Sequence, residues 1–270
     1  MVITILVVLI IVYVALCVAF YFFQHFFFFR PEILSSEFNY NYPFPFEELN
    51  FNMEDGGKIN AVHFKVPNSR GVVYFLKGNS RSIKGWGKFA KDYLSNGYDF
   101  FMMDYRGFGK SYGKRTQTKL FEDAQFLYIW LTSHYRDDQI IVLGRSFGSG
   151  IAARVASWNN PRMLILDSPY LSFLHNTKRF GFFLPLKWLL RYDLRTDLYL
   201  KSVNCPVHSI HGTKDRLISY RQSEQLKALY PDKIELHSIE GAHHNNLPSF
   251  PEFYEVLYDI LYINPEKKKV

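Results

Sequence analysis

The first 23 residues of the chain carry no charged side chain, so this segment is expected to be either a membrane-spanning helix or a signal peptide. At about 1.5 Å rise per residue, a helix of this length covers the roughly 30 Å hydrocarbon core of a bilayer. A cleaved signal peptide would need a basic start, a shorter apolar stretch and a small-residue cleavage site, and none of these is evident. We therefore predict an uncleaved single-pass transmembrane anchor over residues 1–29.

The residues that follow the apolar run suggest where the helix ends and which way it points. Phenylalanines at 26–29 are typical of a membrane interface, and Arg30 and Pro31 come directly after them. No Lys or Arg precedes the span, so the positive-inside rule favours a globular domain on the cytoplasmic side. Residues 30–45 are rich in Pro, Tyr and Phe and are expected to be a tether. A chain that begins near Ser36 is then expected to keep the globular domain whole.

Beyond the tether, short apolar segments alternate with amphipathic ones over residues 46–264, a pattern typical of α/β architecture. We predict a mostly parallel central sheet flanked by helices, followed by a basic tail at 265–270. The expected strands are 61–66, 71–76, 98–103, 139–143, 163–166, 207–211 and 234–239. The expected helices are 84–94, 121–134, 147–157, 220–229 and 250–261.

Charge and short motifs exclude several classes of function. The net charge of +7 comes from scattered Lys and Arg residues, so nucleic-acid binding is not expected, although a mildly basic surface suits anionic lipid head groups. The stretch Gly107–Ser111 lacks the full frame of a phosphate-binding loop, and the chain has neither HExxH nor a Cys-x-x-Cys pair. We therefore expect neither a cofactor nor a metal.

The sequence GRSFGSG at 144–150 sits where a nucleophile would need to be. An apolar strand precedes it and an Ala-rich helical segment follows it, which is the strand–turn–helix context of a nucleophile elbow. Glycines at 144 and 148 would relieve crowding around a strained serine, and the helix N-terminus would favour negative charge nearby. Ser146 is therefore a candidate nucleophile.

An activated serine also needs a histidine oriented by a carboxylate, and both follow later strands. Asp215 comes after the strand at 207–211, and His243 and His244 come after the strand at 234–239. Parallel strands present their carboxyl ends at one edge of a sheet, so these groups should meet. The order Ser, Asp, His is the one that α/β-hydrolases use.

From Phe44 to Leu261 the chain resembles the α/β-hydrolase superfamily, in particular its membrane-anchored depalmitoylases and lysophospholipases. The resemblance rests on YFLKGNS at 74–80, MDYRGFGKS at 103–111, GRSFGSG, LDSPY at 166–170, CPVHSIHGTKD at 205–215 and EGAHHNN at 240–246. It implies that His244, rather than His243, is the base, that Asp215 rather than Asp167 is the acid, and that the amides of Asn79 and Phe147 form the oxyanion hole. Lys77 stands where relatives often carry histidine, so it either attracts an anionic substrate or is a solvated or internally paired lysine.

The predicted function follows from the triad, the anchor and an apolar insert. Residues 170–203 interrupt the core and are expected to form a lid, which either packs on the domain or lines an acyl-chain groove near the bilayer. We expect a serine hydrolase that cleaves an ester or thioester of a small acyl or lipid substrate through an acyl-enzyme. The alternatives are a peptidase or amidase with the same triad and a catalytically silent membrane scaffold. The sequence does not indicate an oligomeric state.

Overall fold

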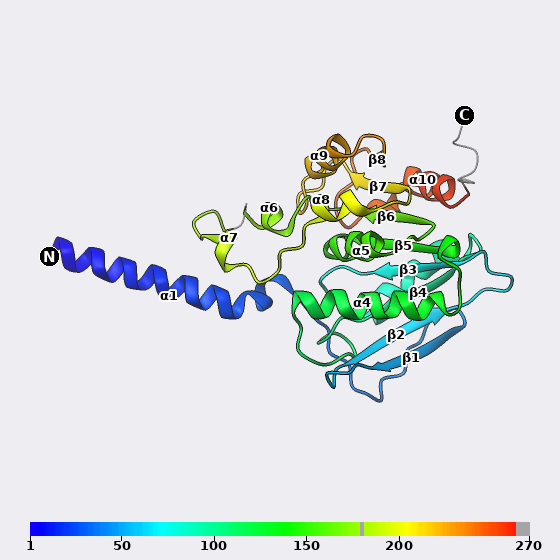
Figure 1. Ribbon diagram of the computed structural model, residues 1–270, viewed down its shortest axis with the longest axis horizontal. Coiled ribbons are helices and arrows are strands. Elements are labelled where there is room, and N and C mark those ends of the chain that lie inside the picture. The colour runs from blue at the N-terminus through cyan, green and yellow to red at the C-terminus, as the bar shows by residue number, and fades with distance from the viewer. Residues whose placement is uncertain (179–180, 263–270) are drawn as a thin grey trace.

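The computed structural model describes residues 1–178 and 181–262, which form one α/β/α domain with a long helix projecting from it (Figure 1). The sheet of the described residues has eight strands in the order β1-β2-β4-β3-β5-β6-β7-β8. β1 pairs antiparallel with β2, β2 pairs antiparallel with β4, and the remaining neighbours are parallel. The predicted mostly parallel α/β sheet is confirmed.

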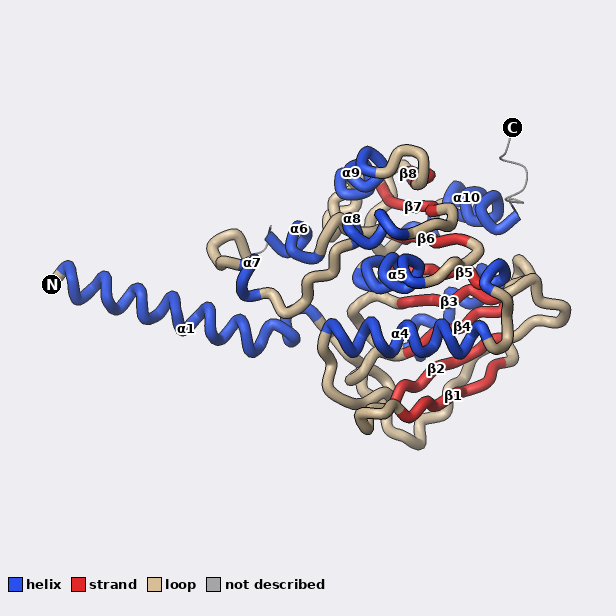
Figure 2. The backbone as a smooth tube through the Cα atoms, in the orientation of Figure 1, coloured by secondary structure: helices blue, strands red, loops and turns tan. Residues whose placement is uncertain are grey.

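The strands (red in Figure 2) alternate with helices along most of the chain. The strands are β1 Phe46–Asn52, β2 Lys58–Phe64, β3 Val72–Leu76, β4 Asp99–Met103, β5 Ile140–Arg145, β6 Met163–Asp167, β7 Val207–Gly212 and β8 Ile234–Ile239. The helices are α1 Val2–Phe28, α2 Ile83–Trp86, α3 Ala90–Leu94, α4 Gln117–Thr132, α5 Phe147–Trp158, α6 Phe173–Lys178, α7 Leu186–Leu189, α8 Thr196–Tyr199, α9 Arg221–Leu229 and α10 Pro251–Tyr262.

Two hydrophobic cores hold the layers together, one on each face of the sheet. Apolar residues of α4, α5, α8 and α9 cover one face, and those of α3 and α10 cover the other. Strands β3 and β5 are buried along their whole length because helices lie on both faces, which explains their continuous apolar runs. The carboxyl ends of β5, β7 and β8 therefore meet at one well-fixed edge.

Helix α1 extends away from the domain (Figure 1), and by length and composition it is able to cross a membrane. Its apolar side chains are exposed, whereas Gln24 is fully buried against the lid. Gln24 Nε2 donates to the carbonyl of Leu189, and the amide of Arg191 donates back to Gln24 Oε1, both at 2.9 Å. The tip of the lid is therefore held beside the end of α1.

The segment that the sequence presents as a tether lies along the domain. The amide of Arg30 donates to the carbonyl of Asn79, and the amide of Arg81 donates to the carbonyl of Arg30. The amide of Gly109 donates to Glu32, and Glu32 also accepts from the Ser82 hydroxyl at 2.6 Å. Residues 30–34 thus join two loops at the carboxyl edge of the sheet.

The structure departs from the predicted elements at a few places. Strand β1 was not predicted, because its mixture of polar and apolar residues does not identify it as a strand until it pairs with β2 at the edge of the sheet. Helix α4 begins at Gln117 rather than 121, where the Thr116 side chain accepts from the amide of Lys119 as an N-cap. The 170–203 insert contains the short helices α6, α7 and α8. The predicted basic tail at 265–270 lies outside the described residues.

Candidate active site

Ser146 occupies a sharp turn between β5 and α5, in a backbone conformation that few non-glycine residues adopt. Its φ of 52° and ψ of −119° put the hydroxyl at the carboxyl edge of the sheet, and its amide donates to the carbonyl of Asp167. The side chain is nearly buried, with 9% of the residue exposed. This is the strand–turn–helix geometry that the GRSFGSG sequence predicts.

Glycine is required on both sides of this serine because α5 passes very close to the sheet. A Cβ on Gly148 would lie 2.0 Å from the carbonyl oxygen of Leu76, and a Cβ on Gly144 would lie 2.4 Å from the Cβ of Ala152. Both distances are far below van der Waals contact. The close approach brings the loop after β3 against the first turn of α5.

A continuous set of hydrogen bonds links Ser146 to the loops that follow β7 and β8. His244 Nε2 lies 3.0 Å from Ser146 Oγ, and His244 Nδ1 lies 2.7 Å from Asp215 Oδ2. His243 is exposed instead, and its amide donates to Asn246 Oδ1. The structure thus brings together Ser146, Asp215 and His244, the three residues that the sequence analysis selects, and their catalytic role stays a prediction.

Both carboxylate oxygens of Asp215 have hydrogen-bond partners. Its Oδ2 also lies 3.1 Å from His211 Nε2, and its Oδ1 accepts from the amides of Leu217 and Ile218. Burial alone would raise the pKa of Asp215, but the hydrogen bonds from His211 and His244 keep it well below its usual range. Asp215 is therefore a carboxylate near neutral pH and is able to fix the tautomer of His244.

The comparisons with known proteins agree with this geometry. Residues 67–192 match the family described as serine aminopeptidase, S33. The chain has the α/β-hydrolase fold, and its sequence is similar to members of that superfamily. Zebrafish (Danio rerio) lysophosphatidylserine lipase ABHD12 is 25% identical over 223 residues, 72% of this chain and 58% of the relative. Human alpha/beta hydrolase domain-containing protein 17B is 26% identical over 210 residues, 75% of this chain and 70% of the relative.

Solved structures share the fold of this α/β-hydrolase. Pyrococcus furiosus esterase Pf2001 superposes with a TM-score of 0.67 at 23% identity, over 86% of this chain and 98% of the esterase. An α/β-hydrolase from Vibrio vulnificus has a TM-score of 0.63 at 19% identity, over 78% of this chain and 77% of that chain. The family and its relatives confirm the predicted superfamily and support a hydrolytic enzyme.

The two residues expected to supply oxyanion amides lie on adjoining segments. Phe147 is the first residue of α5, where backbone amides have no partner within the helix. Asn79 lies in the loop after β3, which Gly148 contacts closely at Leu76 and Lys77. The Asn79 side chain donates to the carbonyl of Phe28 at the end of α1. The hole itself stays a prediction, because it depends on the two backbone amides.

Lys77 is fully buried and internally paired, which is the second of the two readings that its sequence position allows. Its Nζ lies 3.4 Å from Asp104 Oδ1, donates to the carbonyl of Arg81 and sits 3.8 Å above the Phe108 ring. Burial lowers the pKa of Lys77, and the facing Asp104 carboxylate opposes this shift. Through these buried contacts Lys77 stabilises the loop after β3.

Two residues of the site were not predicted, because their roles depend on side-chain directions. Arg145 Nη2 donates to the carbonyl of His244 at 3.0 Å, while its Nη1 pairs with Asp167 at 3.1 Å. This contact gives Asp167 the structural role that the sequence analysis prefers for it. Phe29, expected in an aromatic belt at the membrane interface, is 3% exposed and packs edge-on against the Phe147 ring at 5.1 Å.

Residues able to hold a metal ion lie away from this edge. His208, Glu235 and His237 lie near the amino ends of β7 and β8, whereas Ser146 lies at the carboxyl edge. A cavity of about 630 Å³ beside them is lined in part by Cys205, His208 and Glu235. Neither feature contributes to the arrangement around Ser146.

Proposed function

We propose that the chain is a membrane-anchored serine hydrolase that cleaves an ester or thioester of a lipid or acylated substrate. The observation that carries this proposal is the pair of hydrogen bonds from His244, one to Ser146 and one to Asp215. Within the superfamily this arrangement performs nucleophilic acyl transfer.

The mechanism follows from the position of each group. Ser146 Oγ attacks the carbonyl carbon of the substrate while His244 Nε2 accepts its proton, and Asp215 stabilises the imidazolium. The amides of Phe147 and Asn79 stabilise the oxyanion of the tetrahedral intermediate. Collapse of this intermediate breaks the ester or thioester bond, and His244 returns the proton to the leaving alcohol or thiol. Water, activated by His244, then attacks the acyl-enzyme and releases the acid.

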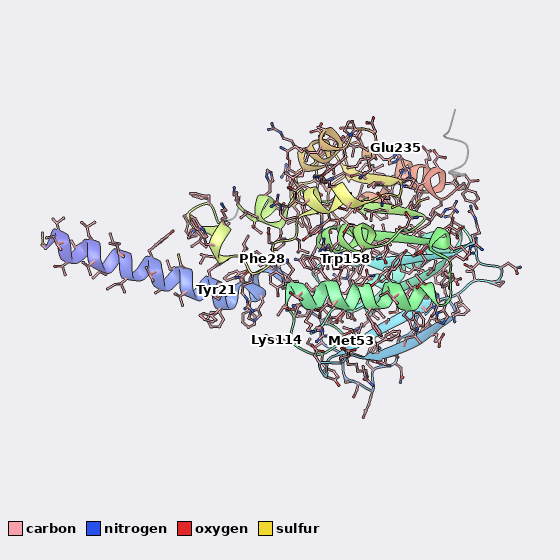
Figure 3. The ribbon with its side chains drawn as sticks, viewed as in Figure 1. Tyr21, Phe28, Met53, Lys114, Trp158 and Glu235 are labelled. Carbon is pink, nitrogen blue, oxygen red and sulfur yellow. The ribbon has the colours of Figure 1, made fainter. Side chains whose placement is uncertain are left out.

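A lipid-like substrate is favoured by the surroundings of Ser146. Phe28 at the end of α1 contacts Phe173 of the lid at 4.9 Å, and Phe173 contacts Phe147 at 5.8 Å. Phe28 lies at the junction of α1 and the domain (Figure 3). The side chains between the end of α1 and Ser146 are therefore apolar, which suits an acyl chain that enters from a bilayer around α1. One of the named relatives is a lysophosphatidylserine lipase.

A peptidase or amidase is the second candidate, because the matching family is described as serine aminopeptidase and the same triad attacks amides. A silent scaffold is disfavoured, because Ser146, His244 and Asp215 are all present and hydrogen-bonded in sequence. On sidedness, Arg30 favours a cytoplasmic domain through the positive-inside rule.

A substrate panel separates these candidates. We expect the full-length chain in detergent micelles to hydrolyse p-nitrophenyl esters, acyl-thioesters and lysophospholipids, with kcat/KM rising with acyl length, and to hydrolyse aminoacyl amides poorly. A fluorophosphonate probe should label the wild type and leave Ser146→Ala unlabelled. Equal labelling of the two proteins would refute the nucleophile, and a preference for aminoacyl amides would favour the peptidase.

A further inference from the structure

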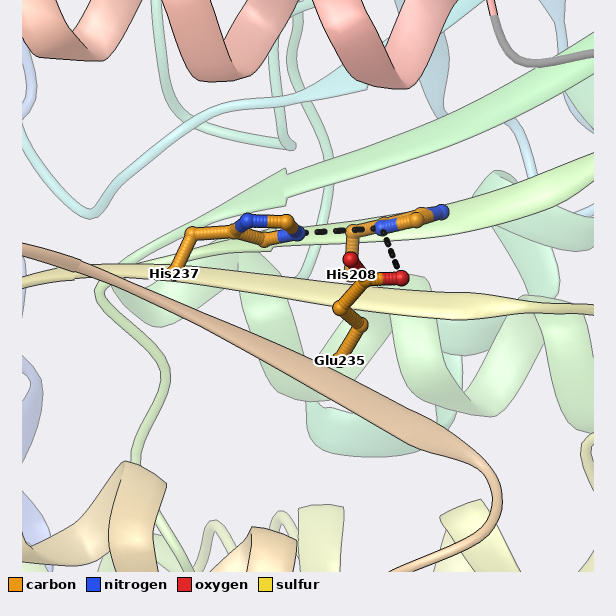
Figure 4. Close-up of side chains that lie close together, drawn as sticks. All are labelled: His208, Glu235 and His237. Atoms are coloured by element: carbon orange, nitrogen blue, oxygen red, sulfur yellow. Dashed lines mark hydrogen bonds and ion pairs between the residues drawn. The ribbon is translucent and has the colours of Figure 1, made fainter.

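Three side chains of types that can ligate a metal ion lie close together on β7 and β8 (Figure 4). His208 and Glu235 lie near the amino ends of these strands, whereas the loops that carry Asp215 and His244 follow the carboxyl ends. His208 lies directly across from Glu235 in the strand register. His237 lies two residues beyond Glu235 on β8, so its side chain leaves the same face of the sheet. The pairing of the strands therefore sets all three side chains side by side before any ligand arrives.

The distances between the donor atoms suit a single small cation. His208 Nδ1 lies 3.1 Å from His237 Nε2 and 3.9 Å from Glu235 Oε2, and the three ligand atoms lie within 4.8 Å of one another. Two atoms bound tetrahedrally to Zn²⁺ at about 2.1 Å are separated by about 3.4 Å. Small side-chain rotations would thus bring all three atoms onto one ion.

The ligand types of these three side chains indicate which class of metal ion they would bind. Two imidazoles and one carboxylate are typical ligands of Zn²⁺ and related transition metals, whereas Mg²⁺ and Ca²⁺ prefer oxygen ligands. Cys205 lines the same cavity but is not among the three side chains whose ligand atoms lie together. The cavity beside His208 and Glu235 offers the ion a path from solvent.

We propose that His208, Glu235 and His237 form a binding site for a divalent transition metal ion of the Zn²⁺ type. The ion takes three protein ligands and completes its shell with water. It clamps β7 to β8, and these strands lead into the loops that carry Asp215 and His244. The proposal departs from the sequence analysis, which expects no metal after searching for helical and paired-cysteine motifs alone. It does not depend on the proposed hydrolase activity.

Metal titration of the full-length chain, purified without an oligohistidine tag and stripped with EDTA, tests the site. We expect one equivalent of Zn²⁺ to bind in isothermal titration calorimetry and to raise the thermal unfolding midpoint. Co²⁺ should give the visible absorption of a tetrahedral complex. His237→Gln and Glu235→Gln should each weaken Zn²⁺ binding by more than about 10-fold. Both residues are partly exposed, so these substitutions should leave the fold intact.

The exposed histidine His134 provides the matched control, and His134→Gln should bind Zn²⁺ as the wild type does. Unfolding midpoints in EDTA should be alike for the wild type and all variants, which separates a lost ligand from a damaged fold. The proposal is overturned if the wild type binds no stoichiometric Zn²⁺. It is also overturned if His237→Gln binds equally tightly, because the ion then sits elsewhere.

Discussion

Asp215 shows how much of the candidate site is built to hold one side chain still. It contacts two imidazoles and two backbone amides, and the loop that carries it is tied to the His244 loop by the bond from the Lys214 amide to the Ala242 carbonyl. Because both of its oxygens are hydrogen-bonded in this way, the Asp215 carboxylate would stay in place if the His244 imidazole moved. In the proposed mechanism, His244 therefore carries the moving proton and Asp215 a stationary charge.

The two adjacent histidines give a direct test of this assignment. His244→Ala should lower kcat on a short ester by about 1,000-fold or more, because the proton acceptor of Ser146 is lost. His243→Ala should keep kcat within a few-fold, since its side chain is exposed. Steady-state kinetics of both variants on p-nitrophenyl acetate provides the comparison. The opposite ranking would move the role of the base to His243.

His63 offers a prediction about pH and stability. It is 1% exposed, its Nε2 lies 3.0 Å from the Tyr135 hydroxyl, and burial lowers its pKa to about 4 although Asp99 lies 3.9 Å away. The unfolded chain protonates this histidine near pH 6.5, so the folded state binds fewer protons between pH 6.5 and 4. The wild type therefore loses up to about 1.4 kcal/mol of stability per pH unit from this group on acidification.

Thermal unfolding of the wild type and His63→Gln at pH 7.5, 5.5 and 4.5 checks this sign. The stability advantage of the wild type should shrink as the pH falls, because the glutamine has no proton to gain. A difference between the two proteins that stays constant with pH would show that His63 does not produce the effect.

At the scale of elements, helix α1 ends inside the domain. Phe29 follows its last turn and packs against Phe147, Phe108 and Tyr192, with the Arg115 guanidinium 4.2 Å from its ring centre. A chain that begins near Ser36 lacks these contacts and the bond between Arg30 and Asn79. We therefore expect the truncated chain to hydrolyse soluble esters more slowly than the full-length chain.

Single substitutions test this coupling without removing the helix. Phe29→Ala should lower the unfolding midpoint, because truncating a buried phenylalanine costs roughly 3–5 kcal/mol. It should also lower kcat/KM on a short ester by about 10-fold through the disturbed support of Phe147. Phe27→Ala, on the same helix but 68% exposed, should change neither quantity. If the two variants behave alike, the end of α1 does not support the site.

Most elements were predictable from the sequence because they are local. Buried strands such as β3 and β5 appear as apolar runs, and the glycines around Ser146 identify the turn between β5 and α5. Strand β1 was missed because it forms only by pairing with β2. The contacts of residues 30–34 were missed for the same reason, since they join parts of the chain about 50 to 80 residues apart. Candidate triad residues were found from strand ends, whereas the role of Arg145 required side-chain directions.

For the whole molecule, the tip of the lid and the candidate span form one apolar surface. The Tyr13 hydroxyl, in the middle of α1, donates to the carbonyl of Phe183 at 3.0 Å. Phe182 is 86% exposed and Trp188 is 77% exposed on the same part of the lid. If α1 lies in a bilayer, these rings lie in it too.

Fluorescence quenching tests whether the tip of the lid inserts into a lipid bilayer. In liposomes whose lipids carry brominated acyl chains, a fraction of the tryptophan emission of the full-length chain should be quenched. Trp188→Phe should remove most of that fraction, because Trp188 is the tryptophan of the lid tip. Trp158→Phe is the control, since this residue lies at the far end of α5. Undiminished quenching in Trp188→Phe would exclude insertion of the lid.

The Asn79 side chain donates to the carbonyl of Phe28, so only part of α1 can be exchanged for another apolar helix. A foreign apolar helix could replace the turns of α1 that precede Tyr13, whose hydroxyl donates to the carbonyl of Phe183 in the lid. The last turn and residues 29–32 could not be exchanged with it, because they contact the lid and the loops beside Ser146. A chimaera must therefore be spliced upstream of Tyr13, with the helical phase kept.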